Sequence, residues 1–197
     1  LQAYQAAFGN VTIALSTDDL AIKEAAAAAG LVTDYLRPES LAGDHAGKVE
    51  TIAHLLEYEE NRLNCTFEYL LDLDVTSPLR NLKDLQDAFS VIEANPEAVN
   101  LFSVSPANRS PYFNMVEQKE NGFFAQVKQP EGMLLTRQSA PKVYDLNASF
   151  YFYRREFFRL GYKGAITDRS LIYVVPHLCF DLDHPIEIGK RHRTVAA

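Results

Sequence analysis

The sequence predicts an α/β protein with a mostly parallel sheet. The central observation is residues 69–80, an apolar run that ends abruptly in carboxylates, hydroxyls, a proline and an arginine. A short apolar run bounded by turn residues is typical of a buried strand of a parallel sheet. Residues 81–89 then carry apolar side chains at helical spacing. Because ligands bind beyond the carboxyl ends of such strands, we expect the chemistry near residues 74–80.

The same alternation of short apolar runs and helical patterns continues along the chain. The runs that predict strands are residues 11–15, 31–36, 67–74, 98–104, 148–153 and 172–175. The patterns that predict helices are residues 1–8, 20–29, 47–60, 82–94 and 154–160. Three successive strand–helix pairs in the first half predict parallel strands joined by right-handed crossovers.

Residues 105–138 interrupt this alternation with three prolines and only short extended pieces, such as residues 122–127. We interpret them as an excursion from a single domain that spans residues 1–197. The large apolar side chains of the excursion are Tyr112, Phe113, Met115, Phe123, Phe124, Met133 and Leu134. A solvated loop does not expose so much apolar surface, so we expect it to need a partner.

The composition excludes several classes of protein. The 47% hydrophobic and 23% charged content is ordinary for one globular domain. A net charge of −7 argues against a general polyanion binder, and so against nucleic acid as a partner. Cys65 and Cys179 are too few for a disulfide framework and lack metal-type spacing, which favours a reducing, cytoplasmic setting. No apolar run approaches the roughly 20 residues of a membrane span and no signal peptide opens the chain, so we expect no membrane partner.

Two carboxylates near the C-terminus predict a metal site. Asp181 and Asp183 lie two residues apart in an extended segment, so both project to the same side and can share one divalent cation. Their hard oxygen ligands suit Mg²⁺ or Mn²⁺ rather than zinc, and we interpret His184 as a turn residue. The alternative is a pair of surface aspartates, because a two-residue period is common.

The motif D-x-D-V-T-S-P-L-R at residues 72–80 resembles the corresponding segment of the CMP-nonulosonate synthetases, the acylneuraminate cytidylyltransferase family. Four further blocks similar to the family stand in the family's order and extend the resemblance over nearly the whole chain. They are Ser16-Thr17-Asp18, Arg37-Pro38 through Leu41-Ala42 to Asp44, Arg137-Gln138 through Pro141 to Asn147, and Phe180-Asp181-Leu182-Asp183.

The resemblance implies a Rossmann-like three-layer α/β/α nucleotidyltransferase fold. It implies an enzyme that transfers CMP from CTP to the anomeric hydroxyl of a nine-carbon sugar acid of the sialic, legionaminic or pseudaminic type, releasing pyrophosphate. The partners implied are CTP and a nonulosonic acid, and residues 105–147 correspond to a homodimer arm.

The resemblance also assigns catalytic roles. It implies that Asp181 and Asp183 hold the Mg²⁺ that organises CTP, where the ion neutralises and aligns phosphate oxygens. Asp74 is the candidate for the polar group beside the attacking hydroxyl. Sialate-type members often carry Gln there, so Asp74 indicates a different nonulosonate. The alternative is that Asp74 caps its own turn through Thr76 or Ser77.

Four positions match the nucleotide side of the site or the motif turn. Arg37, Ala46 and Lys48 match positions that contact the cytosine and ribose in the family, and arginine offers the planar donors that reading a base edge requires. A lone arginine before a proline is alternatively a solvated loop residue. Ser77 of the T-S-P-L-R motif is a further substrate-binding candidate.

Three positions match the sugar side. Arg137, Asn147 and Tyr151 correspond to residues that bind the sugar acid in the family, where a guanidinium can pair with a carboxylate. Ala148 follows Asn147 where the family usually has Asn-Gly, and the added methyl group is expected to tighten the pocket or shift the strand.

The family's first strand and its Gly-rich loop for the triphosphate would precede Leu1, and no segment of residues 1–197 replaces that loop. We therefore expect a fragment of a longer chain with about 30 more residues for a strand, loop and helix. The alternatives are a nucleotide- or sugar-binding module that lost catalysis, and a cytidylyltransferase for the shorter sugar acid KDO.

Overall fold

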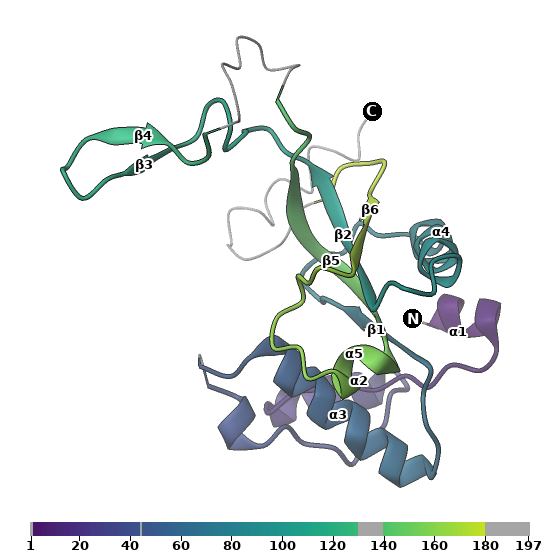
Figure 1. Cartoon of the computed structure of the whole chain (residues 1–197). Coiled ribbons are helices and arrows are strands. Elements are labelled where there is room, and N and C mark those ends of the chain that lie inside the picture. Colours follow the sequence, from purple (N-terminus) through teal and green to yellow (C-terminus); the bar gives the residue numbers. More distant parts are fainter. Residues whose placement is uncertain (1, 44, 130–139, 180–197) are drawn as a thin grey trace, which may run out of the picture.

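The computed structural model describes residues 2–43, 45–129 and 140–179 and confirms the α/β class (Figure 1). The helices are α1 (Gln2–Phe8), α2 (Leu20–Ala28), α3 (Lys48–Leu63), α4 (Leu82–Glu93) and α5 (Arg155–Arg159), with a 3₁₀ turn at Glu39–Leu41. The strands are β1 (Tyr69–Leu73), β2 (Asn100–Pro106), β3 (Val116–Gln118), β4 (Phe124–Gln126), β5 (Tyr144–Arg154) and β6 (Ser170–Val174). None of the helices in these ranges combines the length and apolarity that crossing a membrane requires.

The main sheet has the strand order β1-β5-β2-β6. β5 pairs antiparallel with both β1 and β2, whereas β2 and β6 pair in parallel. β1, β2 and β6 therefore run in one direction and β5 in the other. A mostly parallel sheet was predicted, but the reversal of β5 makes the pairing in the described sheet mostly antiparallel. The reversal arises because β2 leads to β5 through the excursion and not through a helical crossover, which a parallel connection would need.

Two predicted strands are absent. Residues 11–15 and 31–36 have no regular secondary structure, and within the described residues neither segment pairs with a strand. The Arg37 amide donates to the Thr17 carbonyl (2.9 Å) just beyond their ends, and Val32 is 79% exposed. A strand exists only through its ladder, so apolar composition alone was insufficient. The predicted crossovers in the first half are wrong, because β1 is the one strand that this region gives to the described sheet.

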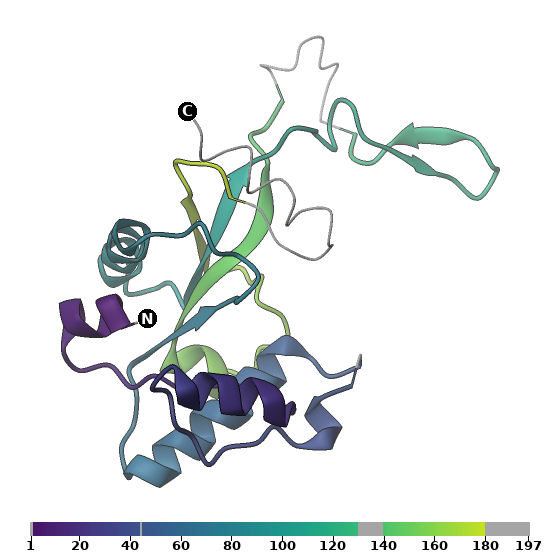
Figure 2. The ribbon, with the colours of Figure 1, turned by 180° about the vertical axis from the view of Figure 1, so that it is seen from behind.

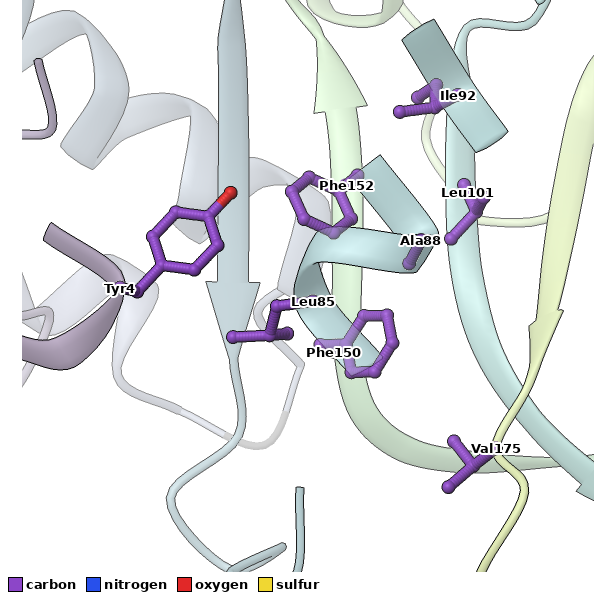
Figure 3. Close-up of a cluster of buried hydrophobic side chains, with 8 residues drawn as sticks. All are labelled: Tyr4, Leu85, Ala88, Ile92, Leu101, Phe150, Phe152 and Val175. Carbon is purple, nitrogen blue, oxygen red and sulfur yellow. The ribbon is translucent and has the colours of Figure 1, made fainter. Parts of the chain in front are cut away.

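Apolar side chains pack on both faces of the sheet and give three layers, as predicted. On one face, residues of α1 and α4 meet the sheet (Figure 3): Tyr4, Leu85, Ala88, Ile92, Leu101, Phe150, Phe152 and Val175. On the other face, residues of α3 and α5 meet it: Val49, Val99, Phe102, Val104, Tyr151, Tyr153 and Phe157. Successive side chains of β5 alternate between the two clusters, which follows from the two-residue period of a strand. Burying each large apolar side chain contributes about 1.5–3 kcal/mol.

The excursion carries a separate hairpin. β3 and β4 pair antiparallel with each other and project away from the main sheet (Figures 1 and 2). The hairpin and its flanks expose large apolar side chains: Phe113, Met115, Val116, Phe123 and Phe124. We call residues 111–129 the arm hairpin. Met133 and Leu134 of the predicted apolar set lie outside the described residues.

Candidate functional site

The candidate site lies at one edge of the main sheet. Because β1, β2 and β6 share a direction, their carboxyl ends meet at this edge, where residues 74–80 follow β1 and residues 175–179 follow β6. The connection after β6 contacts the start of α4, which follows residues 74–80 in the chain: His177 Nε2 lies 2.8 Å from Asp84 Oδ2. This contact joins segments that are 93 positions apart in the sequence.

Asp74 opens the turn after β1 and uses its two carboxylate oxygens differently. Oδ1 accepts hydrogen bonds from the Thr76 amide (3.2 Å) and the Thr76 hydroxyl (2.8 Å), as the capping interpretation predicted. Oδ2 lies 3.7 Å from Lys48 Nζ. The turn therefore fixes the carboxylate, while its second oxygen faces the Lys48 ammonium group.

Lys48 is the first residue of α3, and its ammonium group meets three residues of the sheet edge. Nζ lies 3.0 Å from Asp72 Oδ2, near Asp74, and 4.5 Å from the centre of the Tyr151 ring. Burial alone would lower the pKa of Lys48, but Asp72, Tyr151 and Asp74 outweigh burial and raise it above its usual value. Asp72 Oδ2 is buried and accepts no well-aligned hydrogen bond within the described residues, so the ion pair offsets its burial.

Arg80 and Ser77 hold the turn against β5. The Arg80 guanidinium donates to the carbonyl oxygens of Ser149 and Asp74, which is a structural role. Ser77 is fully buried, and its hydroxyl donates to the Asn147 carbonyl (3.4 Å). In this structure the Ser77 hydroxyl therefore bonds within the protein.

The Asn147 side chain is also engaged within the protein. Its Oδ1 accepts from the Ser103 hydroxyl (2.6 Å) and the Ser149 amide (3.3 Å), and its Nδ2 donates to the Ser105 hydroxyl (3.1 Å). These bonds tie β5 to β2 beside the site. Sequence reasoning assigned Asn147 to the sugar acid and missed this network.

The hydrogen bonds of Asn147 lie beside an irregularity in the pairing of β5 with β2, which we interpret as a β-bulge. The register between β2 and β5 shifts between Phe102 and Val104, and Ala148 has a positive φ of 52°. A left-handed backbone favours glycine, so the Asn-Ala sequence places a methyl group at a strained position. Bulges often change the direction of side chains next to functional sites. This bulge lies between two predicted sugar-binding residues, Asn147 and Tyr151.

Arg37 lies in a separate cluster with the segment before α2. Its Nε and Nη2 donate to the hydroxyl and carbonyl of Ser16 (3.1 and 2.6 Å), and Nη1 lies 3.7 Å from Asp18 Oδ1. Ala46 is in the loop that leads to Lys48, and its amide donates to the Gly43 carbonyl (2.9 Å). The predicted nucleotide residues thus belong to a loop that runs from Arg37 to the start of α3.

No family model matches the sequence. Over 175 residues the chain is 34% identical to CMP-N,N'-diacetyllegionaminic acid synthase of Campylobacter jejuni subsp. jejuni serotype O:2, a match that covers 89% of this chain and 73% of the relative. The chain belongs to the CMP-nonulosonate synthetase family. Identity and coverage are the same for Post-translational flagellin modification protein B of Campylobacter coli.

A solved structure supports the fold of this CMP-nonulosonate synthetase family member. The structure of CMP:2-keto-3-deoxy-manno-octonic acid synthetase complexed with CTP matches with a TM-score of 0.59, covering 98% of this chain and 86% of that chain. At 13% identity the likeness concerns the fold alone, and it confirms the predicted nucleotidyltransferase fold.

The metal residues expected for a CMP-nonulosonate synthetase, Asp181 and Asp183, lie outside the described residues, as does Arg137. Within the described residues, no group of three or more His, Cys, Asp and Glu side chains could hold a metal ion. The paired carboxylates of Asp181 and Asp183 have the donor chemistry that Mg²⁺ prefers. The connector that leads to these two residues contacts Asp84, at the start of α4, through His177.

The contact between His177 and Asp84 was missed by sequence reasoning. Asp84 closes a capping box with Asn81 at the start of α4, and this part was readable from the Asn-x-x-Asp spacing. Its pairing with His177 was not readable, because it joins residues 93 positions apart. The hydrogen bond to Asp84 and the Leu178 carbonyl outweigh the opposing effect of burial and raise the pKa of His177.

Proposed function

We propose that the chain transfers CMP from CTP to the anomeric hydroxyl of a nine-carbon sugar acid and releases pyrophosphate. The observation that carries the proposal is the 34% identity over 175 residues to a CMP-N,N'-diacetyllegionaminic acid synthase. Further support is that the connector after β6 contacts the start of α4, the helix that directly follows the Asp74 turn. Acids of the legionaminic type are the first acceptor class that we propose, followed by the pseudaminic and sialic types.

In the proposed reaction the anomeric oxygen forms a bond to the α-phosphorus of CTP, and the bond from that phosphorus to the pyrophosphate oxygen breaks. The hydroxyl proton must leave the attacking oxygen, and we assign Asp74 Oδ2 to accept it. The Thr76 bonds to Oδ1 and the Lys48 ammonium beside Oδ2 support this assignment, since they fix the direction of the carboxylate.

We assign Asp181 and Asp183 to hold a divalent ion, Mg²⁺ or Mn²⁺. When bound, the ion supplies charge neutralisation and alignment of the CTP phosphates. The support within the described residues is the direction of β6, which runs parallel to β2, and the contact of its connector with the start of α4.

On the substrate side, we assign Arg37 and Ala46 to the nucleotide, and Arg137, Asn147 and Tyr151 to the sugar acid. Lys48 lies against the Tyr151 ring and joins the nucleotide loop to the sugar side. Lys48 was predicted on the nucleotide side, and we now propose that it also serves acceptor binding, because a sugar carboxylate near Asp72 and Asp74 would be repelled without this ammonium group.

The test is a coupled pyrophosphate-release assay on the full-length protein with CTP and a panel of legionaminic, pseudaminic, sialic and KDO acids. Release with a nine-carbon acid is expected. Release with KDO alone would replace the proposal by a KDO-type enzyme. Binding of CTP or sugar without release by any acid would indicate a non-catalytic module.

A further inference from the structure

A surface hollow of about 330 Å³ lies where β1 begins and β5 ends. Tyr69 pairs with Arg154 in the antiparallel ladder, so the residues before β1 lie beside those that open α5. Figure 1 shows α5 next to α3 in this region. The Asp74 turn follows the opposite end of β1. The charged residues that line the hollow, which we call the arginine hollow, are Glu68, Arg154, Arg155, Glu156 and Arg159.

The short helix α5 brings two of these arginines to one face. Residues four positions apart are neighbours on a helix surface, so Arg155 and Arg159 project from the same side. Phe157, between them in the sequence, is fully buried in the cluster on the α3 face of the sheet. Like charges at this spacing repel each other, and a negative group beside them relieves the repulsion.

Glu60 of α3 neutralises one of the two arginines. Nε and Nη2 of Arg155 each lie 2.9 Å from a carboxylate oxygen of Glu60, and the two side chains are 20% and 12% exposed. This two-point contact fixes the guanidinium at the wall of the hollow. Among the described residues it leaves the Arg155 Nη1 atom without a hydrogen-bond acceptor.

The other two arginines have no carboxylate partner in the described part of the chain. The Arg154 guanidinium donates to the Tyr69 hydroxyl (2.6 Å) and to backbone carbonyl oxygens, among them those of Ala98 and Ile92 (3.0 and 2.7 Å). These acceptors are neutral, so they satisfy its donors without cancelling its charge. The Arg159 side chain is exposed and bonds no other residue in ranges 2–43, 45–129 and 140–179.

The two carboxylates of the lining leave the local charge positive. Glu156 Oε1 already pairs with Arg169 Nη1 at 3.1 Å. Glu68 is exposed, and its side chain forms no ion pair with a described residue. Two unpaired guanidinium groups therefore exceed one unpaired carboxylate, in a protein whose net charge is −7. A positive excess in a hollow of an acidic protein attracts small anions.

We propose that the arginine hollow binds a small anion through a phosphate group, held by Arg159 and by the Arg155 Nη1 atom. A phosphate group carries close to two negative charges and three acceptor oxygens, so it can meet two guanidinium groups at once, whereas a carboxylate matches a single fork. A volume of about 330 Å³ is at the lower end of the range for small-molecule sites. The inference does not depend on the proposed transfer of CMP.

The first experiment is an NMR titration of the full-length protein with inorganic phosphate, followed through the arginine Nε–H signals. The Arg159 signal, assigned by its loss in Arg159→Gln, should shift in a saturable manner. Sodium chloride at the same ionic strength should not reproduce the shift, because it only screens. No saturable shift with phosphate, or an equal shift with chloride, overturns the proposal. Acetate should bind more weakly, and equal binding of acetate overturns the choice of phosphate.

The second experiment compares the phosphate affinity of variants through the Arg155 Nε–H signal. Arg159→Gln should weaken binding about tenfold, because a charge-assisted donor is lost. Glu68→Gln should tighten binding, because a repelling carboxylate is removed. The matched control is Lys163→Gln, which removes one positive charge nearby but outside the lining and should change the affinity less than about twofold. Equal weakening in Arg159→Gln and Lys163→Gln would reduce the effect to general surface charge and overturn the site.

The Arg80 signal separates this hollow from the candidate site, because Arg80 holds the turn at the other end of β1. Phosphate that shifts Arg80 but not Arg159 binds at the candidate site, and the proposal fails. If pyrophosphate release fails with every sugar acid while Arg159 responds as expected, the proposed function fails and the phosphate site stands. Thermal melts of Arg159→Gln exclude unfolding as the cause of weak binding, and the wild-type titration does not depend on the stability of any variant.

Discussion

Lys48 Nζ lies 3.0 Å from Asp72 Oδ2, so the first residue of α3 pairs with a carboxylate of β1 at the edge where the site lies. Lys48 is 47% exposed, and solvent weakens the pair. Lys48→Met should lower the free energy of unfolding by about 1 kcal/mol, because Asp72 Oδ2 loses its counter-charge. It should raise the KM for the sugar acid more than that for CTP.

Urea unfolding and steady-state kinetics check this expectation. Lys83→Met is the control, because Lys83 pairs with Asp87 on an exposed helix face and its loss should cost less than about 0.5 kcal/mol. The double variant Lys48→Met/Asp72→Asn should recover part of the stability. No recovery in the double variant would show that the pair does not account for the loss.

Ala148→Gly should stabilise the protein by about 0.5–1 kcal/mol, because Ala148 has φ 52° and glycine adopts this conformation without strain. The control is Ala125→Gly in β4, which has no positive φ and should lose stability. Equilibrium unfolding of the two variants against the wild type gives the measurement. A loss of stability in both variants would mean that the bulge does not strain Ala148.

The contribution of His177 to stability should depend on pH with a definite sign. The pKa of His177 is raised in the folded protein, so its pairing stabilises the fold fully below the unfolded value of 6.5 and the benefit disappears as pH rises through the raised value. The difference in unfolding free energy between wild type and His177→Gln should therefore be larger at about pH 6 than at about pH 9. A difference that grows with pH would contradict a raised pKa of His177 in the folded protein.

The arm hairpin should form a homodimer contact. Phe123 and Phe124 are 75% and 67% exposed, and a stable interface needs such apolar side chains at its centre. Analytical ultracentrifugation of the full-length protein at micromolar concentration should show a dimer, and Phe123→Ser/Phe124→Ser should shift it toward monomer. Leu20→Ser, an exposed apolar residue of α2, is the control and should remain dimeric. A strictly monomeric wild type would refute the arm as a dimer contact.

Asp181→Asn and Asp183→Asn should each reduce turnover and raise the Mg²⁺ requirement, because each replaces a hard anionic ligand by a neutral amide of the same shape. Folding should survive, so thermal melts should stay near the wild type. The measurement is a Mg²⁺ titration of pyrophosphate release in the full-length protein. Unchanged turnover and unchanged Mg²⁺ dependence in both variants would move the metal site elsewhere.

The sequence predicted the elements whose signals are local. α4 follows the β1 turn as expected, because helical spacing and the Asn81 cap are both encoded within a few residues. Residues 11–15 were predicted as a strand and are not one, because a strand depends on a neighbour that composition does not reveal. The reversal of β5 was missed for a related reason: direction depends on how the excursion returns to the sheet.

For the candidate site, too, the sequence predicted the local contacts but not the long-range ones. Asp74 was found from its motif, and its contact with Thr76 lies within two residues. Asp72 and Asp84 were passed over, because their partners Lys48 and His177 come from distant elements. Long-range ion pairs leave no periodic trace in a sequence, so they appear only when the chain is folded.

The position of β5 between β1 and β2 also sets an order of assembly during synthesis. β1 and β2 each pair with β5, and within the described sheet they do not pair with each other. On a growing chain, the first two strands of this sheet therefore wait for Tyr144–Arg154 before either can complete these ladders. Contacts over such sequence distances form slowly and leave strand edges exposed meanwhile. A nascent chain that stops before residue 144 cannot form the β1 ladder and keeps the edges of β1 unpaired within the described sheet.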